Sequence, residues 1–278
     1  MYGDTQVAAQ KPFRHLSVAQ SVKGAGAGLA LLVLAACQTN GANGTNGLLN
    51  TSDSQEMDGI VRTLYQAGRE AEASNNFEEA ASIYGRLYEK RSDDPAVLAA
   101  YIRNMRYVGR AAEISNFVGS RAQDLLENQH VKFEYAKALL VAGRKKDSLA
   151  ALQQVQTQMP DNWRVHSALG IAYDGFGRFD DAVAAYDTAL QLSPDNTVVM
   201  NNLAMSQAMT GQLSAAIKTL KRAATLNRTN SQIRQNLALL YAINGDVEHA
   251  RSLAAMDLNA SDLETNLSFY RRFEGVGQ

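Results

Sequence analysis

Small and apolar residues return with a period of 34 residues over most of this chain. Residues suited to a left-handed turn mark the period, at Asn75, Gly109, Gly143, Gly177, Gly211 and Gly245. Such a residue ends a helix at low steric cost and lets the chain turn back on itself. Helix-favouring residues are abundant, and β-branched runs of strand length are scarce. We therefore predict an all-α protein made of repeated pairs of helices.

Residues 163–196 form the clearest copy of the repeat. Two antiparallel helices approach closely only where small side chains face each other, here Gly170 and Ala182. Tyr173 and Tyr186 fill the space around that contact. The copy resembles the tetratricopeptide repeat, through Leu169, Gly170 and Tyr173 in its first helix, Ala182, Tyr186 and Ala189 in its second, and Pro194 at its end. The resemblance implies a right-handed solenoid of helix-turn-helix units.

The copies follow one another without an insertion. We place six of them within residues 61–264, at 61–94, 95–128, 129–162, 163–196, 197–230 and 231–264. The copy at 95–128 is the least regular, because Ile102 and Ile114 stand where small residues are usual, so its two helices should cross at a different angle.

A further helix is expected after the last copy. Ser261 and Glu264 form a capping-box pattern, which predicts a capping helix and tail within residues 261–278, with Gly275 as the stop. A solenoid needs such a helix to cover the open end of its stack.

The first 36 residues have the order of a secretory signal. Lys11, Arg14 and Lys23 precede an apolar run, Gly24–Ala36, that is shorter than the roughly 20 residues of a spanning helix. The sequence "LAAC", Leu34–Cys37, then resembles the lipobox of bacterial lipoproteins, in which signal peptidase II cuts before a lipidated cysteine. The resemblance implies a signal peptide at 1–36 and acyl chains such as palmitate on Cys37. The alternative is a small buried cysteine in an ordinary signal sequence.

Residues 37–60 are expected to form a lipidated tether. From Gln38 to Gln55 they are mostly Gly, Asn, Ser and Thr, with little to bury. As a flexible coil this stretch spans roughly 25 Å. In the lipoprotein family, Asp after the cysteine retains a protein at the inner membrane, and Gln38 stands there instead. The expected location is therefore the periplasmic face of the outer membrane, through the lipid anchor.

The composition argues against chemistry in this chain. The 27 basic and 28 acidic residues nearly cancel, so no overall field attracts nucleic acid. One cysteine allows neither an intramolecular disulfide nor a thiolate metal cluster. His130, His166 and His249 fall in different repeats without metal-ligand spacing, and no catalytic motif is present. We expect no catalytic residue, metal, cofactor or small-molecule substrate, and a protein or peptide as partner.

The resemblance implies that partners bind the concave face formed by the first helices of the repeats. The earlier half of that face should be basic, with Tyr65, Tyr107 and Phe133 among Arg62, Arg69, Arg103, Arg106 and Lys137. The later half carries amide and apolar side chains, at Ile171, Asn201, Asn202, Met205, Met209, Gln235, Asn236, Leu239 and Ile243. Amides can bond any peptide backbone, and Met adapts its shape. The alternative is that these residues pack between repeats or are ordinary solvated charges.

The layout of lipobox, tether and six repeats resembles that of tight-adherence (Flp type IVb) pilus assembly lipoproteins of the TadD type, as does the sequence "NLSFYRRF" after Asp262. The resemblance implies a scaffold that helps a secretin or another pilus component to reach or assemble in the outer membrane. An envelope adaptor that recruits peptidoglycan hydrolases or proteases would use the same face, and it stays open as the alternative.

Overall fold

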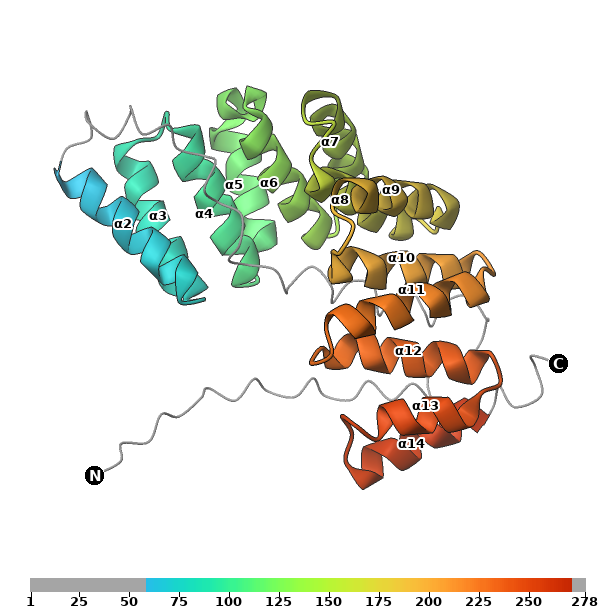
Figure 1. Ribbon diagram of the computed structural model, residues 1–278. Helices are drawn as coiled ribbons and strands as arrows, with labels where there is room; N and C mark the ends of the chain where they lie inside the picture. Colours follow the sequence, from blue (N-terminus) through green and yellow to red (C-terminus); the bar gives the residue numbers. More distant parts are fainter. Residues whose placement is uncertain (1–58, 272–278) are drawn as a thin grey trace, which may run out of the picture.

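The computed structural model describes residues 59–271, which contain thirteen α-helices and no strand. The expected signal peptide, Cys37, almost all of the tether and Gly275 lie outside this range. Figure 1 shows pairs of helices stacked in chain order along a curved path. The prediction of an all-α solenoid is confirmed. Between residues 59 and 271, no helix is long and apolar enough to cross a membrane.

Each of the six repeats is a helical hairpin. The pairs are α2 (Gly59–Ala73) with α3 (Phe77–Lys90), α4 (Pro95–Tyr107) with α5 (Ala111–Arg121), α6 (Gln129–Val141) with α7 (Lys145–Gln158), α8 (Trp163–Asp174) with α9 (Phe179–Leu192), α10 (Thr197–Met209) with α11 (Leu213–Leu226), and α12 (Ser231–Ile243) with α13 (Val247–Ala254). A 3-10 helix, η4 (Gln123–Glu127), follows α5, and α14 (Ala260–Tyr270) ends the described chain.

The turn inside each hairpin has the left-handed backbone that the 34-residue period predicts. The five glycines of the series have φ between 71° and 82°, and Asn75 has φ 57°. A side chain at any of the five glycines would meet no atom within 4 Å. Backbone conformation, rather than crowding, therefore requires glycine at these turns.

The start of each later hairpin is fixed by a second series with the same period. An Asp or Asn side chain accepts a backbone N–H from the first turn of the first helix, at Asp94, Asn128, Asn162, Asn196 and Asn230. Such a cap stabilises a helix by about 1 kcal/mol. Helix starts and hairpin turns thus share one period, which keeps the six units in register.

Where the two helices of a hairpin cross, the sizes of the two facing side chains are matched. A Cβ on Gly170 would lie 2.5 Å from the Tyr186 ring, and one on Gly68 would lie 2.9 Å from the Tyr84 ring. In the other repeats the first residue is larger than Gly and the second, sixteen positions later, is smaller than Tyr: Ile102 with Val118, Ala136 with Leu152, Ala204 with Leu220, and Ala238 with Ala254. A tyrosine at the second position is thus found only opposite a glycine, as close packing demands.

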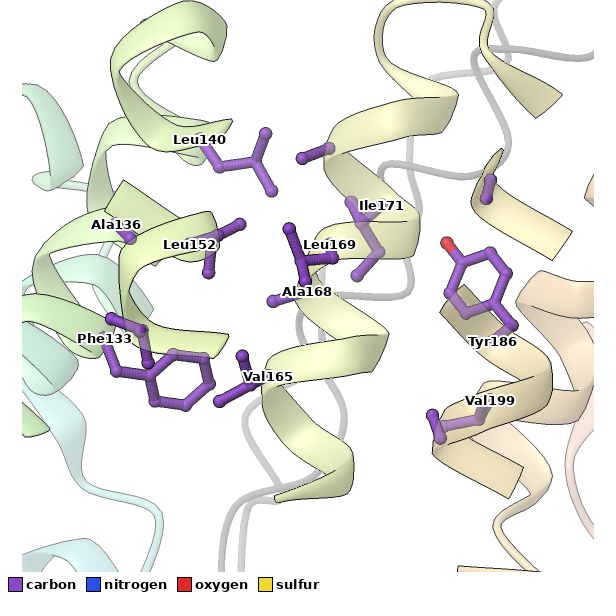
Figure 2. Packing of buried hydrophobic residues seen from close by; sticks show 14 of the residues in the cluster. Phe133, Ala136, Leu140, Leu152, Val165, Ala168, Leu169, Ile171, Tyr186 and Val199 are labelled. Atoms are coloured by element: carbon purple, nitrogen blue, oxygen red, sulfur yellow. The ribbon is translucent and has the colours of Figure 1, made fainter. Parts of the chain in front are cut away.

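The buried core crosses the boundaries between repeats, since one cluster of buried residues contains side chains of the third, fourth and fifth repeats. Figure 2 shows Phe133 and Leu152 of the third repeat pointing toward Val165 and Leu169 on α8, with Tyr186 on the other side of that helix. Helix α8 is therefore buried by contacts on both of its sides, from the third repeat and from its own second helix.

The second repeat departs from the others, as Ile102 and Ile114 suggested. Both isoleucines are buried, at 0% and 1% exposure. Helices α4 and α5 approach each other less closely than the helices of the other pairs, and α5 is short and followed by η4. Side chains with four carbons at the crossing hold the two helices apart.

Helix α14 covers the end of the stack. Leu267 is fully buried against Ala238, Ala242, Ala250 and Ala254. The expected terminal helix is confirmed over the described residues, but its cap is not Ser261 with Glu264. The side chain of Asn259 accepts from the Asp262 N–H at 3.0 Å and donates to the Asp262 carboxylate at 2.8 Å. The capping pair is thus Asn259 with Asp262, two residues before the expected pair of Ser261 with Glu264. The side-chain amide of Asn259 forms both bonds, one through its oxygen and one through its nitrogen.

Candidate partner-binding face

The residues expected to contact a partner all lie on the first helices of the repeats: α2, α4, α6, α8, α10 and α12. Neighbouring first helices touch directly, notably α4 with α6 and α10 with α12. A side chain on the face that these helices share is therefore either buried against the next first helix or accessible to a partner. The structure separates the two halves of the predicted site in this way.

The amide-bearing half is closed. Asn201, Asn202, Met205 and Asn236 are exposed by only 5%, 1%, 1% and 4%. The Asn236 amide donates to the Asn201 carbonyl oxygen at 2.8 Å, which links α12 to α10. The sequence analysis placed these four side chains where a peptide would contact them, whereas the structure buries them almost completely. The Asn236–Asn201 bond joins neighbouring repeats instead.

Gln235 and Leu239 are half-buried, and both make contacts within the protein. Gln235 donates to Asp257 at 3.2 Å, and Asp257 is paired with Arg234. Leu239 packs against the core beneath α14. Both contacts tie α12 to the end of the stack and leave only part of each side chain accessible.

The basic half is more open. Arg62 and Arg69 are exposed on α2, while Arg103 on α4 and Lys137 on α6 are partly buried. Arg106 is 8% exposed, so most of its guanidinium is inside. The structure thus keeps the basic residues on neighbouring first helices, but at different depths.

Glu72 anchors the first part of this basic half. Its carboxylate accepts from Arg103 Nη2 at 2.6 Å and from Asn104 Nδ2 at 2.6 Å, and the Tyr84 hydroxyl donates to it at 3.3 Å. These bonds join α2, α3 and α4. Bonds to a carboxylate are among the stronger side-chain hydrogen bonds, so they fix the first two repeats relative to each other.

Glu134 lies at the centre of the second part. Lys137 donates to Glu134 Oε1 at 2.7 Å, whereas Arg106 stays 3.7 Å from Oε2, beyond hydrogen-bond distance. Burial raises the pKa of the Glu134 carboxyl, but Lys137, Arg106 and Arg103 outweigh it and hold that pKa below its ordinary value. Burial also lowers the pKa of Lys137 to about 8, against the attraction of Glu134.

The cluster of Glu72, Arg103, Arg106, Glu134 and Lys137 has more cations than carboxylates. Among the described residues, Arg106 Nε and Glu134 Oε2 have no hydrogen-bond partner although both are buried. Tyr107 and Phe133 stack beneath two of the cations, with Arg106 4.4 Å and Lys137 4.5 Å from the ring centres. Lys137 keeps part of its side chain accessible, so it is the cation of this cluster that an anionic group could reach.

A third polar cluster was not predicted. Asp174 at the end of α8 is buried and accepts from the Tyr186 hydroxyl at 2.8 Å and from Ser206 Oγ at 2.7 Å. Burial raises the pKa of Asp174 to about 6, while both hydrogen bonds act to lower it. The signal was present in the spacing: Asp174 with Tyr186 and Glu72 with Tyr84 are both acid–tyrosine pairs twelve residues apart.

Two histidines of the described chain make contacts within the protein. His166 contacts the Pro160 carbonyl at 2.6 Å, and His249 pairs with Asp246 and stacks on Tyr241. Within the described range no three metal-ligating side chains come together. These contacts give the histidines structural roles.

Comparison with known proteins agrees with this architecture. The tetratricopeptide repeat family matches residues 57–96, 133–197 and 175–240. The unmatched stretch between them contains most of the irregular second repeat. A search of curated proteins found no match in sequence.

Solved structures give the same result. MamA (residues 41 to the end) from Desulfovibrio magneticus RS-1 aligns over 63% of this chain and 98% of its own, with 17% identity and a TM-score of 0.51. YrrB, described as a TPR protein with an unusual peptide-binding site, aligns over 69% of this chain and 99% of its own (15% identity, TM-score 0.51). The APC/C complex Cut9–Hcn1 aligns over 78% of this chain and 44% of its own (15%, 0.63). At these identities the likeness is one of fold, and with the family matches it places the chain among the tetratricopeptide-repeat proteins.

Proposed function

We propose that this protein is a lipid-anchored scaffold of the bacterial outer membrane that binds a protein partner and assists assembly or secretin localisation of a tight-adherence pilus. The anchor rests on the lipobox at Leu34–Cys37 and the polar tether after it. The pilus role rests on the resemblance in layout and in the "NLSFYRRF" sequence. The fold supports protein binding, since solenoids of this kind present long surfaces to other proteins.

We place the partner on the basic first helices α2, α4 and α6. The observation that carries this choice is the excess of cations in the cluster, where Arg103, Arg106 and Lys137 face only two carboxylates and part of Lys137 stays accessible. The exposed Arg62 and Arg69 extend the same charge along α2. A partner segment that carries carboxylates would be drawn to this half, because opposite charge speeds and orients encounter. The other half is occupied by contacts between repeats.

The site can be tested on its own. In cells that produce the full chain, Arg62→Glu with Arg69→Glu should reduce recovery of the pilus secretin with the tagged protein by about tenfold or more. Arg86→Glu is the matched control, because Arg86 is exposed on the outer helix α3 of the same hairpin. Equal recovery with both variants would place the partner elsewhere.

The role and the anchor need separate tests. A deletion strain should lose the secretin multimer on immunoblots of outer membranes, and a strain that assembles it normally would refute the pilus role. Recovery of cell-wall hydrolases in place of the secretin would favour the adaptor. Cys37→Ala should abolish palmitate labelling and release the protein from membranes, and persistent labelling would refute the anchor.

A further inference from the structure

The second helices of the fourth and fifth repeats carry opposite charges on their outer surfaces. Helix α9 contains three acids and no base, and α11 contains three bases and no acid. Asp180 and Asp187 are exposed on α9, while Lys218 and Lys221 are exposed on α11. Residues spaced by three or seven positions lie on one face of a helix. Each helix therefore presents a stripe of one sign to solvent.

These four charges have no partners within residues 59–271. Their side chains form no ion pair or hydrogen bond there, unlike Arg222 on α11, which bonds to Asp195 at 3.0 Å. Partial desolvation raises the pKa of Asp187, and no cation beside it offsets the effect. The neighbouring outer helix α7 differs, because its equivalent positions hold Lys146, Ala150 and Gln153. The paired stripes are thus particular to α9 and α11.

Two neighbouring stripes of opposite sign form a self-complementary surface. A twofold axis that runs parallel to α9 and α11, midway between them and just outside their outer surface, would place α9 of one copy against α11 of the second. The same operation places α11 of the first copy against α9 of the second, so both contacts are attractive. Asp187 and Lys221 occupy equivalent positions, 34 residues apart, so they would face each other across the interface.

Exposed apolar side chains lie on the same two helices. Leu192 ends α9 with 38% exposure and Leu226 ends α11 with 47% exposure. They are among the most exposed large apolar residues of the described chain. They follow Asp187 and Lys221 by five residues, so they lie on a different side of each helix from the charges. Exposed ion pairs contribute only about 0–1 kcal/mol each, so the association should be weak.

We propose that this protein forms a twofold symmetric dimer in which the acidic outer face of α9 of each copy binds the basic outer face of α11 of the other. The partner is a second copy of this chain. The dimer surface lies on the second helices α9 and α11, whereas the proposed partner site lies on the first helices α2, α4 and α6. The dimer therefore leaves the partner site accessible. The assembly should weaken with salt, because its charges are exposed and screened beyond about 10 Å at 0.1 M ionic strength.

Complementary charge reversal tests the proposal on the full chain in detergent micelles. Variant one is Asp180→Lys with Asp187→Lys, which makes both stripes basic. Variant two is Lys218→Glu with Lys221→Glu, which makes both stripes acidic. Each alone should self-associate at least about tenfold more weakly than the wild type in sedimentation experiments, because attraction becomes repulsion at both contacts. Mixed together, the two variants should form a heterodimer, since each stripe then meets its opposite.

The matched control is Lys146→Glu with Arg251→Glu, which reverses two exposed charges on the outer helices α7 and α13 and should leave association unchanged. Circular dichroism checks that all variants remain folded. A monomeric wild type would overturn the proposal, as would variants that associate like the wild type. Loss of association in both variants without recovery on mixing would also overturn it. An effect of variant two alone would instead indicate an acidic partner on α11.

Discussion

The fit between Gly170 and Tyr186 gives the sharpest test of how this sequence builds its hairpins. A Cβ on Gly170 would lie 2.5 Å from Tyr186 Cε1, 2.6 Å from Cζ and 2.7 Å from Cδ1. The ring has no room to withdraw, because Tyr186 is 0% exposed and its hydroxyl donates to the buried Asp174. Overpacking a close-packed core costs about 1–3 kcal/mol. Gly170→Ala should therefore lower the free energy of unfolding.

The sign of this effect distinguishes packing from helix propensity. In a helix interior, replacing Gly with Ala usually stabilises by about 0.5–1 kcal/mol. Gly119→Ala on α5 is the matched control, because a Cβ there would meet only the Tyr135 hydroxyl, at 3.2 Å. We expect Gly119→Ala to be neutral or stabilising and Gly170→Ala to be destabilising by about 1–2 kcal/mol after the propensity gain is included.

A second substitution should remove the strain. Adding Tyr186→Leu creates the Ala–Leu pair that the third and fifth repeats already use at Ala136 with Leu152 and at Ala204 with Leu220. Tyr186→Leu alone should be costly, since it opens a cavity and removes a hydrogen bond from Asp174. The two changes should therefore couple favourably by at least about 1 kcal/mol in a double-mutant cycle.

The chain carries its own reporter for this experiment. Trp163, its single tryptophan, opens α8 in the same repeat and packs against the same core. Its fluorescence during denaturant unfolding therefore follows the fourth repeat directly. The reasoning fails if Gly170→Ala is as stable as Gly119→Ala, or if its cost is unchanged in the presence of Tyr186→Leu.

Three further predictions concern buried polar groups and the end of the stack. Because the folded-state pKa of Asp174 is raised from 3.8 to about 6, its stabilising contribution is complete below 3.8 and lost as pH rises through 6. The free energy of unfolding should thus grow by at most about 3 kcal/mol between pH 7 and 4, and denaturant titrations of Asp174→Asn should lack that growth. Glu134→Gln should destabilise by about 3–5 kcal/mol, because Arg106 and Lys137 lose their carboxylate, and wild-type stability in thermal unfolding would contradict this. Leu267→Ala should cost about 2–5 kcal/mol and speed hydrogen exchange first in α13 and α14, whereas a uniform increase along the chain would show that the end cap is not a local unit.

The turns and the register of this fold could be predicted from sequence because they depend on local conformation. Gly143 and Gly177 have positive φ for reasons that need no knowledge of the neighbouring repeats. The cap of α14 was harder to predict from sequence, since Ser261 and Asn259 are both good capping residues. Only the path of the chain after α13 makes Asn259 the one that meets the first turn.

The candidate site was harder to predict, because exposure on the inner face depends on how closely successive first helices pack. Met205 and Lys137 occupy the same position of their repeats, yet Met205 is 1% exposed and Lys137 keeps part of its side chain accessible. An apolar side chain gains by being covered, whereas a lysine keeps its ammonium in water where it can. A 34-residue period assigns both residues to one face and cannot separate these outcomes.

The polar groups of the two halves also respond differently to an incoming ligand. The Asn236–Asn201 bond is already formed, so a peptide that inserted there would have to break it before it gained anything. Asn202 Nδ2 is unsatisfied in that half, but its residue is only 1% exposed. Arg106 Nε and Glu134 Oε2 are buried in the same way, but Lys137 beside them keeps part of its side chain accessible. A carboxylate that reached Lys137 would meet a cluster in which three cations face two carboxylates. An anionic ligand therefore gains electrostatic attraction at the basic half without first breaking an amide pair such as Asn236–Asn201, which is the physical reason for placing the partner there.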